Sequence, residues 1–293
     1  MNRKILPLTF LLIFSLATSG LFAEEKIKVL IADGPQKAHK YLDTTPVLKQ
    51  ILAKLPRFEV DHSRSSKESC EDGSYKPDFS KYDVVVMNEG FGAADWPEAT
   101  QKAFEDFMAN GGGMVSIHAA NNCWPNWKEY NKMTGIGGWS GRNEESGPYL
   151  YLDSEGNVVR DNSKGKGGAH GPQHEFEIVV RDQEHPIMKG LPPKYLHGPD
   201  ELYDRLRGPA ENVTILASAF SSEEYRGTGR HEPALMAISY GEGRVFHTIL
   251  GHHVKQMQEG SFVTTFLRGT EWAATGEVTI PVPEDFPNQS FDK

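Results

Sequence analysis

Short, continuous apolar runs alternate with amphipathic segments in the N-terminal part of the chain. Such runs are typical of strands that are buried on both faces of a sheet, and they stand at residues 29–32, 84–87 and 114–117. Apolar residues at helical spacing predict a helix over residues 97–110, which Gly111 ends. Thr44 or Thr45 before Pro46 indicates the start of another helix, with Pro at its first position and residues 47–55 as its continuation.

This alternation of strands and helices predicts an α/β fold. Short turns between the elements imply parallel neighbouring strands with right-handed crossovers. The runs that end at Ala32, Met87 and Ile117 should therefore end side by side on one edge of one sheet. Residues 58–62 alternate between apolar and polar positions and predict an outer strand, whereas the polar residues 63–81 are expected to form a surface loop.

The chain departs from this rhythm after the third apolar run. Residues 121–171 are rich in Trp, Gly and Asn, and a long irregular insertion is more often a binding loop than a linker. Regular elements then resume, with strands expected at residues 175–180, 213–219, 235–239 and 244–250 and a closing helix at residues 262–274. One domain over residues 24–276 is expected, followed by a proline-containing extended tail, residues 277–293.

The stretch GGGMVSIHAANNC, residues 111–123, indicates where the chemistry lies. His118 stands where the strand should stop, and the small residues Ala119 and Ala120 follow it. A sharp turn of this kind presents a polar side chain at the carboxyl edge of the sheet, where α/β proteins bind their ligands. Amidohydrolase-like folds carry a Cys or Ser nucleophile at this corner, so a histidine here argues against an elbow thiol.

Polar residues follow other predicted strands in the same way. Asp33, Asn88 with Glu89, and His252 each come directly after an apolar run, as His118 does. If these strands are parallel neighbours, all of these positions line one crevice. Asp33, Asn88 and Glu89 are therefore candidate substrate-binding residues, and the alternative for each is a capping or turn residue.

Eleven histidines is a high count for 293 residues. His170 and His174 have the spacing of two zinc ligands on one helix, but Gly171 and Pro172 between them exclude a helix. A loop can still bring both to one site, so they are candidate substrate-binding residues. Turn or surface positions are the alternative for both.

A carboxylate accompanies the histidines at Glu201, which lies close to His197 in the sequence. Imidazole and carboxylate together suit zinc or another divalent metal, and they also suit general acid–base catalysis on a hydroxyl or glycosidic oxygen. We interpret His118, Glu201 and His252 as the candidate catalytic centre and as the candidate metal ligands.

Three tryptophans follow the His118 strand. Trp124, Trp127 and Trp139 offer flat apolar faces against which a sugar ring can pack, and Trp124 and Trp127 are candidate substrate-binding residues. Filling of the core is the equally weighted alternative.

Several classes of function are excluded by what the sequence lacks. The chain has no P-loop, no G-x-G-x-x-G after the first strand, no G-x-S-x-G and no C-x-x-C, which excludes nucleotide cofactors, serine hydrolases of that type and thioredoxin-like chemistry. A formal charge of −9 disfavours nucleic acid as a partner. Cys70 and Cys123 are either a disulfide or two free thiols, and a hydrolase that uses Cys123 is disfavoured because this residue lies five positions past the elbow.

Residues 2–23 have the pattern of a secretory signal. Arg3 and Lys4 are basic, residues 6–17 are apolar, and Ala23 is a suitable last residue before cleavage. The apolar core is shorter than the roughly 20 residues of a membrane span. We expect an exported protein, periplasmic or extracellular, without stable membrane insertion.

The order of several short motifs resembles the ThuA-like (trehalose-utilisation) family. They are GGG at residues 111–113 with HAA at 118–120, HPI at 185–187, DELY at 200–203, YGEGRVF at 240–246 and GH at 251–252. The resemblance covers residues 28–275. It implies a flavodoxin-like three-layer sandwich with a mainly parallel sheet, similar to class I glutamine amidotransferases without their catalytic Cys. It also implies a link to the breakdown of disaccharides and keto sugars.

Two further segments look like those of a secreted bacterial branch of this family that is often found with sugar-degrading enzymes. They are AHGPQHEF at residues 169–176 and GTGRHEP at residues 227–233. Arg230 and His231 in the second segment are therefore added to the candidate substrate-binding residues.

Two hypotheses of function follow. The first is an exported carbohydrate-active enzyme that acts on a disaccharide, a keto sugar or a related glycoside, with assistance from a divalent metal such as zinc. The second is a non-catalytic sugar-binding module that keeps the fold without the chemistry. Turnover of oxidised and unoxidised disaccharides distinguishes them.

Overall fold

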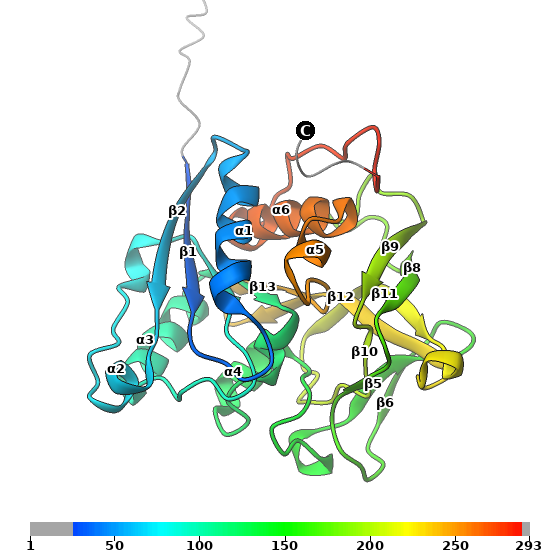
Figure 1. Ribbon diagram of the computed structural model, residues 1–293, viewed down its shortest axis with the longest axis horizontal. Helices are drawn as coiled ribbons and strands as arrows, with labels where there is room; N and C mark the ends of the chain where they lie inside the picture. Colours follow the sequence, from blue (N-terminus) through cyan, green and yellow to red (C-terminus); the bar gives the residue numbers. More distant parts are fainter. Residues whose placement is uncertain (1–25, 289–293) are drawn as a thin grey trace, which may run out of the picture.

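The computed structural model describes residues 26–288. The expected signal, residues 2–23, lies outside the described residues. Within them, an eleven-stranded mixed sheet forms the centre of the fold and carries helices on both faces (Figure 1). This is the α/β fold that the sequence pattern predicts, and it is consistent with the flavodoxin-like three-layer sandwich that the family resemblance implies.

Five neighbouring strands of this sheet are parallel, in the order β2-β1-β3-β4-β13. They are β1 (Ile27–Asp33), β2 (Phe58–Arg64), β3 (Val84–Asn88), β4 (Gly113–Ile117) and β13 (Gly243–Thr248). Ala32 pairs with Met87, and Met87 pairs with Ser116. The ends of β1, β3 and β4 therefore lie side by side, as predicted, and β2 is the outer strand.

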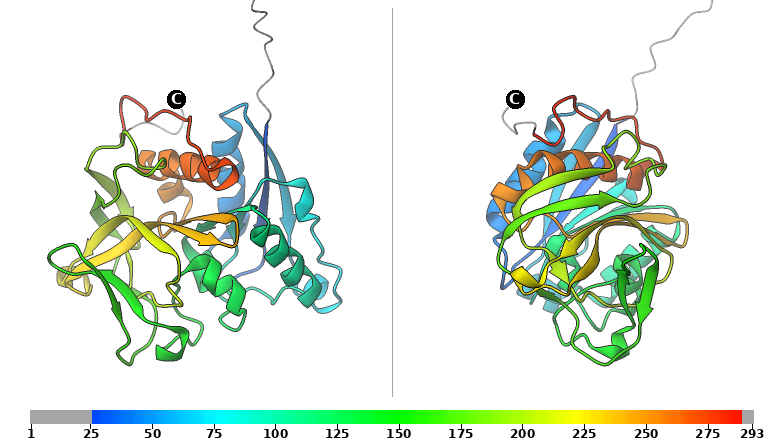
Figure 2. Two further views of the ribbon diagram at one scale, coloured as in Figure 1. Left: turned by 180° about the vertical axis from the view of Figure 1, so that it is seen from behind. Right: turned by 90° about the vertical axis from the view of Figure 1, so that its right-hand side faces the viewer.

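The other half of the sheet is antiparallel, a feature that apolar runs alone do not reveal. It continues from β13 through β12 (Arg230–Tyr240), β11 (Val213–Ser221), β8 (His174–Val180) and β9 (Lys194–Asp200). A hairpin of β5 (Tyr149–Leu152) and β6 (Val158–Asp161) joins β12, and β7 (Ala169–His170) pairs separately with β10 (Tyr203–Asp204). Figure 2 shows the two halves on opposite sides of the molecule, the N-terminal strands in blue and the antiparallel strands in green to yellow.

The helices complete the outer layers. Those of more than one turn in the described residues are α1 (Tyr41–Ala53), α2 (Lys67–Glu71), α3 (Glu98–Ala109), α4 (Lys128–Thr134), α5 (Val254–Met257) and α6 (Gly260–Thr275). Helices α1, α5 and α6 lie together on one face of the sheet, and α3 and α4 cover the other (Figure 1). Across residues 26–288, no helix combines the length and apolarity that crossing a bilayer requires.

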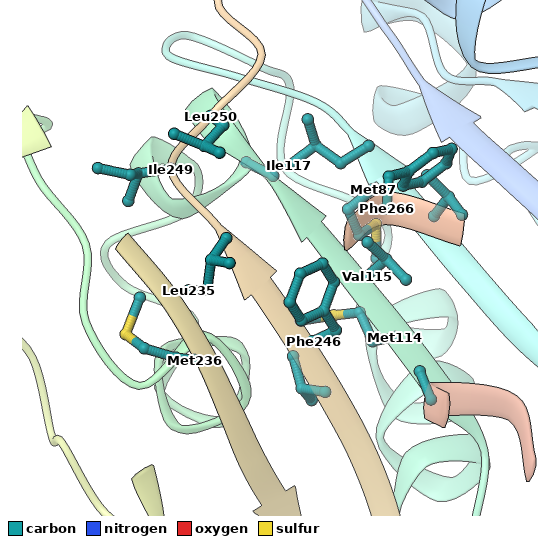
Figure 3. Packing of buried hydrophobic residues seen from close by; sticks show 14 of the residues in the cluster. Met87, Met114, Val115, Ile117, Leu235, Met236, Phe246, Ile249, Leu250 and Phe266 are labelled. Carbon is teal, nitrogen blue, oxygen red and sulfur yellow. The ribbon is translucent and has the colours of Figure 1, made fainter. Parts of the chain in front are cut away.

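The core lies between the sheet and these helices. Val115 of β4 and Phe246 of β13 are fully buried, as is Phe266 of α6. Figure 3 shows part of this packing, with side chains from β3, β4, β12, β13 and α6. The continuous apolar runs thus form strands covered on both faces, and the polar residues at their ends are fixed on a rigid edge.

Some boundaries differ from the prediction. Helix α1 begins at Tyr41, so Pro46 lies inside the helix and not at its first position. The reason is that the hydroxyl of Thr45 is not a cap but donates to the carboxylate of Asp33, at 2.6 Å. The predicted loop of residues 63–81 contains α2, whose Ser66 makes a capping box with Ser69.

The insertion of residues 121–171 is more regular than expected, because it contains α4 and the β5–β6 hairpin. Strand β12 begins at Arg230, five residues earlier than predicted, and β13 ends at Thr248. After Gly276, the described part of the tail has no helix or strand, as expected, and Ile280 and Phe286 pack against the core.

A candidate metal centre at the carboxyl edge of the sheet

Four side chains from distant parts of the sequence converge at one point. They are His39 in the loop after β1, His118 at the end of β4, Glu201 directly after β9, and His252 in the loop after β13. One ligand atom from each lies within 4.8 Å of all the others. We call these four residues the His/Glu cluster.

The topology explains this convergence. The carboxyl ends of the parallel strands β1, β4 and β13 share one edge of the sheet. Strand β9 lies four places beyond β13 in the sheet order, yet β4 and β9 both contact α6. The sheet therefore curves around α6 and brings the end of β9 back to the same edge.

His118 occupies the predicted elbow. Its φ of 43° lies in the left-handed region, which a residue other than Gly rarely adopts and which marks a strained, functional turn. Its Nδ1 lies against the carbonyl oxygen of Ile249. Since a carbonyl only accepts, the hydrogen bond assigns the ring proton to Nδ1, and Nε2 presents its lone pair to the cluster.

The separations between ligand atoms match a shared cation. His252 Nδ1 lies 3.0 Å from Glu201 Oε2, 3.1 Å from His39 Nε2 and 3.2 Å from His118 Nε2. His118 Nε2 and Glu201 Oε2 are 3.7 Å apart. Bonds of roughly 2.0–2.1 Å to a tetrahedral zinc ion place its ligands about 3.3 Å from one another. Three imidazoles and one carboxylate are also a donor set that zinc accepts.

Burial and the neighbouring histidines keep the imidazole of His39 neutral, as a metal ligand must be. Burial, followed by the neighbouring His118 and His252, lowers the pKa of His39 to about 2. Burial raises the pKa of Glu201, but the neighbouring rings of His118 and His252 lower it by a larger amount, so its net pKa lies well below the usual value. The free side chains thus present lone pairs from imidazole and a carboxylate anion to the same point.

A buried acid next to Glu201 fixes the backbone of two cluster residues. Asp200 Oδ1 accepts from the amide of Glu201 at 2.8 Å, and Oδ2 accepts from the amide of Gly251 at 2.8 Å. His197 Nε2 donates to the same Oδ2 at 3.0 Å, and its Nδ1 accepts from the hydroxyl of Ser261 at 2.6 Å. All of these side chains are buried. Outer partners of this kind orient the groups that bind a metal.

Further rings surround the cluster. The ring of Tyr203 lies 4.1 Å from that of His118, and the ring of Trp139 lies 4.6 Å from that of Tyr203. His170 of β7 places its Nε2 3.6 Å from Glu201 Oε2. His170 therefore lies at the predicted site, beside the cluster but outside its ligand set.

Three predicted substrate-binding residues are buried in a separate network. Asp33 accepts from Arg64 and Thr45, and Asn88 donates to Thr45 at 2.8 Å. Glu89 accepts from Ser65 at 2.9 Å, and burial raises the pKa of Glu89 to about 7. These contacts tie the ends of β1 and β3 to neighbouring elements.

Trp124 and Trp127 lie in the core, as their alternative interpretation states. Both are buried within an aromatic group that includes Trp96 and Tyr130. Their indole N–H groups donate to Ala94 and Glu105, respectively. No large face of either indole is free to bind a sugar ring.

The side chains of His174, Arg230 and His231 contact residues outside the cluster. His174 stacks on Tyr225 with ring centroids 3.9 Å apart. Arg230 donates to the buried Glu232 at 2.7 Å, and His231 contacts the hydroxyl of Ser218 at 3.3 Å. Each of these three side chains thus has a partner in β11, in β12 or in the turn between them.

His39 is the cluster residue that sequence reasoning missed. It lies in a polar loop, six residues after Asp33, without an apolar strand directly before it. One general rule could have pointed to His39: every loop that follows a parallel strand reaches the same edge of the sheet, so a histidine in such a loop can reach the site. Cys70 and Cys123 are free and buried, and burial raises the pKa of the Cys123 thiol well above its usual value, which disfavours it as a nucleophile.

Comparisons with known proteins agree with this fold. A ThuA-like protein from Parabacteroides merdae ATCC 43184, known from a crystal structure, is 45% identical over 90% of this chain and 95% of that chain, with a TM-score of 0.85. A ThuA-like protein from Bacteroides uniformis ATCC 8492 shares the fold at 19% identity and a TM-score of 0.58, over 93% of this chain and 98% of that chain. No curated protein matches this chain. Residues 28–273 match the family described as ThuA, trehalose utilisation, and the chain therefore belongs to the ThuA family.

Proposed function

We propose that this protein is an exported enzyme that binds a divalent metal at the His/Glu cluster and acts on a small carbohydrate, a disaccharide or a keto sugar. The observation that carries the proposal is the convergence of four ligand atoms within 4.8 Å of one another. The family description, trehalose utilisation, supports the sugar as the class of substrate. The secretory pattern of residues 2–23 supports export.

The residues of the cluster have distinct tasks in this proposal. His39, His118, Glu201 and His252 would hold the metal, which supplies Lewis-acid polarisation of a sugar oxygen or activation of a water molecule. Asp200 holds the backbone of Glu201 and of Gly251, beside His252. The side chains of Glu201 and His252 are 13% and 11% exposed, whereas that of His118 is 2% exposed. The approach of a substrate is therefore expected from their side.

Metal analysis of the purified full-length protein tests this proposal. We expect about one divalent ion per chain, and we expect most of it to be lost in His252→Ala and Glu201→Gln. His174→Ala is the matched control, because the ring of His174 stacks on Tyr225 and is outside the ligand set although its strand position pairs with Asp200, and it should keep the ion. A wild-type protein that neither retains nor takes up zinc, cobalt or manganese would contradict metal binding.

Turnover separates the enzyme from the non-catalytic module. Trehalose, maltose and their keto derivatives are suitable substrates, with products followed by chromatography. Conversion that disappears together with the metal supports the enzyme, whereas binding without conversion of any of these sugars supports the module. Export is tested by N-terminal sequencing of secreted protein, which should begin near Glu24, and a sequence that begins at Met1 contradicts it.

A further inference from the structure

We propose that His170 and Trp139 form a subsite beside the His/Glu cluster that binds one hydroxylated sugar ring. The inference rests on the proposed function, because it places the sugar next to Glu201. It assigns the hydroxyl contact to His170 Nε2 and the ring contact to the indole of Trp139. Neither residue belongs to the four candidate metal ligands.

His170 presents an acceptor that no donor of the described residues satisfies. Its Nδ1 lies 2.8 Å from the carbonyl oxygen of Gly171. Since that oxygen only accepts, the ring proton is on Nδ1 and Nε2 carries a lone pair. His170 Nε2 lies 3.6 Å from Glu201 Oε2. A carboxylate oxygen is itself an acceptor, so it does not supply the missing donor. The side chain of His170 is 35% exposed, so a ligand can reach it.

A hydroxyl group is the complement of this arrangement. As a candidate metal ligand, Glu201 would have its partner in the metal, so the missing donor is the one for His170. A hydroxyl donates one hydrogen bond to the imidazole, whereas a carbonyl oxygen of a keto sugar cannot. The subsite is therefore selective for a ring position that still carries its hydroxyl group.

Trp139 supplies a flat face next to this acceptor. Its ring centroid lies 5.9 Å from that of His170 and 4.6 Å from that of Tyr203. Unlike Trp124 and Trp127, it is only partly buried. One face of a pyranose consists of C–H groups that pack on an aromatic ring, while its hydroxyl groups extend from the rim toward polar partners.

The backbone holds Trp139 in this place at a cost in free energy. Trp139 has a φ of 54° and Ser140 a φ of 49°, both in the left-handed region. The amide of Trp139 donates to Gly167 at 2.7 Å, and the hydroxyl of Ser140 donates to Asn122 at 2.6 Å. A Cβ on Gly168 would meet the Trp139 amide nitrogen at 2.7 Å. Strain of this kind persists where the surroundings fix it, and it gathers at ligand sites.

Calorimetric titration of the metal-loaded full-length protein with trehalose tests the subsite. His170→Phe keeps a ring and removes the acceptor, so it should weaken trehalose binding about 5- to 30-fold, the effect of one hydrogen bond. His170→Gln keeps an acceptor oxygen and should lose less. Trp139→Ala should weaken binding about 10-fold, an effect of the size expected for one aromatic contact, and Trp139→Phe should retain most of the affinity.

His174→Phe is the matched control, since the ring of His174 packs on Tyr225 and not on His170 or Trp139, and it should bind trehalose as the wild type does. Metal content and melting temperature are measured on every variant. Unchanged trehalose affinity in folded, metal-loaded His170→Phe and Trp139→Ala would overturn the subsite and leave the proposed function intact. Loss of metal from His170→Phe would also overturn it, because His170 would then be a ligand. A wild-type protein that binds neither trehalose, maltose nor their keto derivatives would overturn both.

Discussion

Asp200 and Gly251, 51 positions apart in the sequence, are joined by a hydrogen bond of 2.8 Å from the Gly251 amide to the Asp200 carboxylate. The same carboxylate accepts from the amide of Glu201. One buried acid thus sets the positions from which Glu201 and His252 extend into the cluster. A structural link of this kind predicts that ligand geometry depends on a residue that touches no ligand atom.

Asp200→Asn is expected to weaken metal binding. An amide offers one acceptor oxygen in place of two, so either Glu201 or the Gly251 turn loses its backbone anchor. We expect the affinity for zinc to fall about 10- to 100-fold, as for other outer partners of metal sites, and the free energy of unfolding to fall by about 1–3 kcal/mol. Competition with a chelating dye and urea denaturation measure the two quantities.

Asp106→Asn serves as the control for that change, since Asp106 is exposed and paired only at the surface of α3. It should leave both quantities close to the wild-type values. Lower stability of Asp200→Asn with unchanged zinc affinity would mean that Asp200 has a role in folding alone.

His118 and His252 should act as one unit. His118→Asn is the suitable variant because Asn tolerates the left-handed backbone that His118 adopts. If both histidines ligate one metal, each single variant should lose most of the ion and most of the activity, and the double variant should lose little more. If they are an acid–base pair, each loss should cost roughly 10²- to 10⁴-fold in rate with metal content unchanged.

Metal content, melting temperature and turnover of the two single variants and the double variant separate these cases. Structural histidines would lower the melting temperature and leave the rate per folded molecule intact. A rate loss in the double variant equal to the product of the single losses would exclude a shared site.

Glu89 should make stability depend on pH. Burial raises its pKa from 4.5 to about 7, so the folded state binds its proton more tightly than the unfolded state does. The stabilisation is complete below pH 4.5 and is lost as the pH rises through 7. A shift of this size corresponds to about 3 kcal/mol at most.

Glu89→Gln removes this titration while keeping an acceptor for Ser65. We expect the variant to gain roughly 2 kcal/mol relative to the wild type between pH 5 and pH 8, measured by urea denaturation at both pH values. Glu177→Gln, at an exposed position of β8, should show no such change. An equal difference between Glu89→Gln and wild type at the two pH values would refute the raised pKa.

Trp124→Ala should act on stability and not on sugar binding. The indole is buried against Trp96 and Tyr130, and removal of such a side chain costs about 3–5 kcal/mol. Urea denaturation measures this loss. Trehalose titration of the folded fraction should give the wild-type affinity. A loss of trehalose binding without a loss of stability would mean that Trp124 contacts the sugar.

The parallel half of the fold and the positions of His118 and His252 can be predicted from the sequence alone. Val84 to Met87 and Met114 to Ile117 are apolar at every position because both faces of the sheet are covered, and this local pattern needs no long-range information. His118 is recognisable for the same reason, since it is the first polar residue after a buried strand. His252 follows β13 in the same manner, and parallel pairing of β13 with β4 brings the two together.

The rest of the site depends on contacts between segments that are far apart in the sequence. Glu201 reaches the cluster because the antiparallel strands curve around α6, and strand direction is not encoded in an apolar run. His39 joins from a loop without any periodic pattern, and Trp139 is partly buried beside His170 whereas Trp124 and Trp127 are buried in the core. Residues with similar local sequence thus lie either in the core or at the site, depending on their contacts with distant segments of the chain. The free energy of those contacts depends on packing between segments, which no single stretch of sequence specifies.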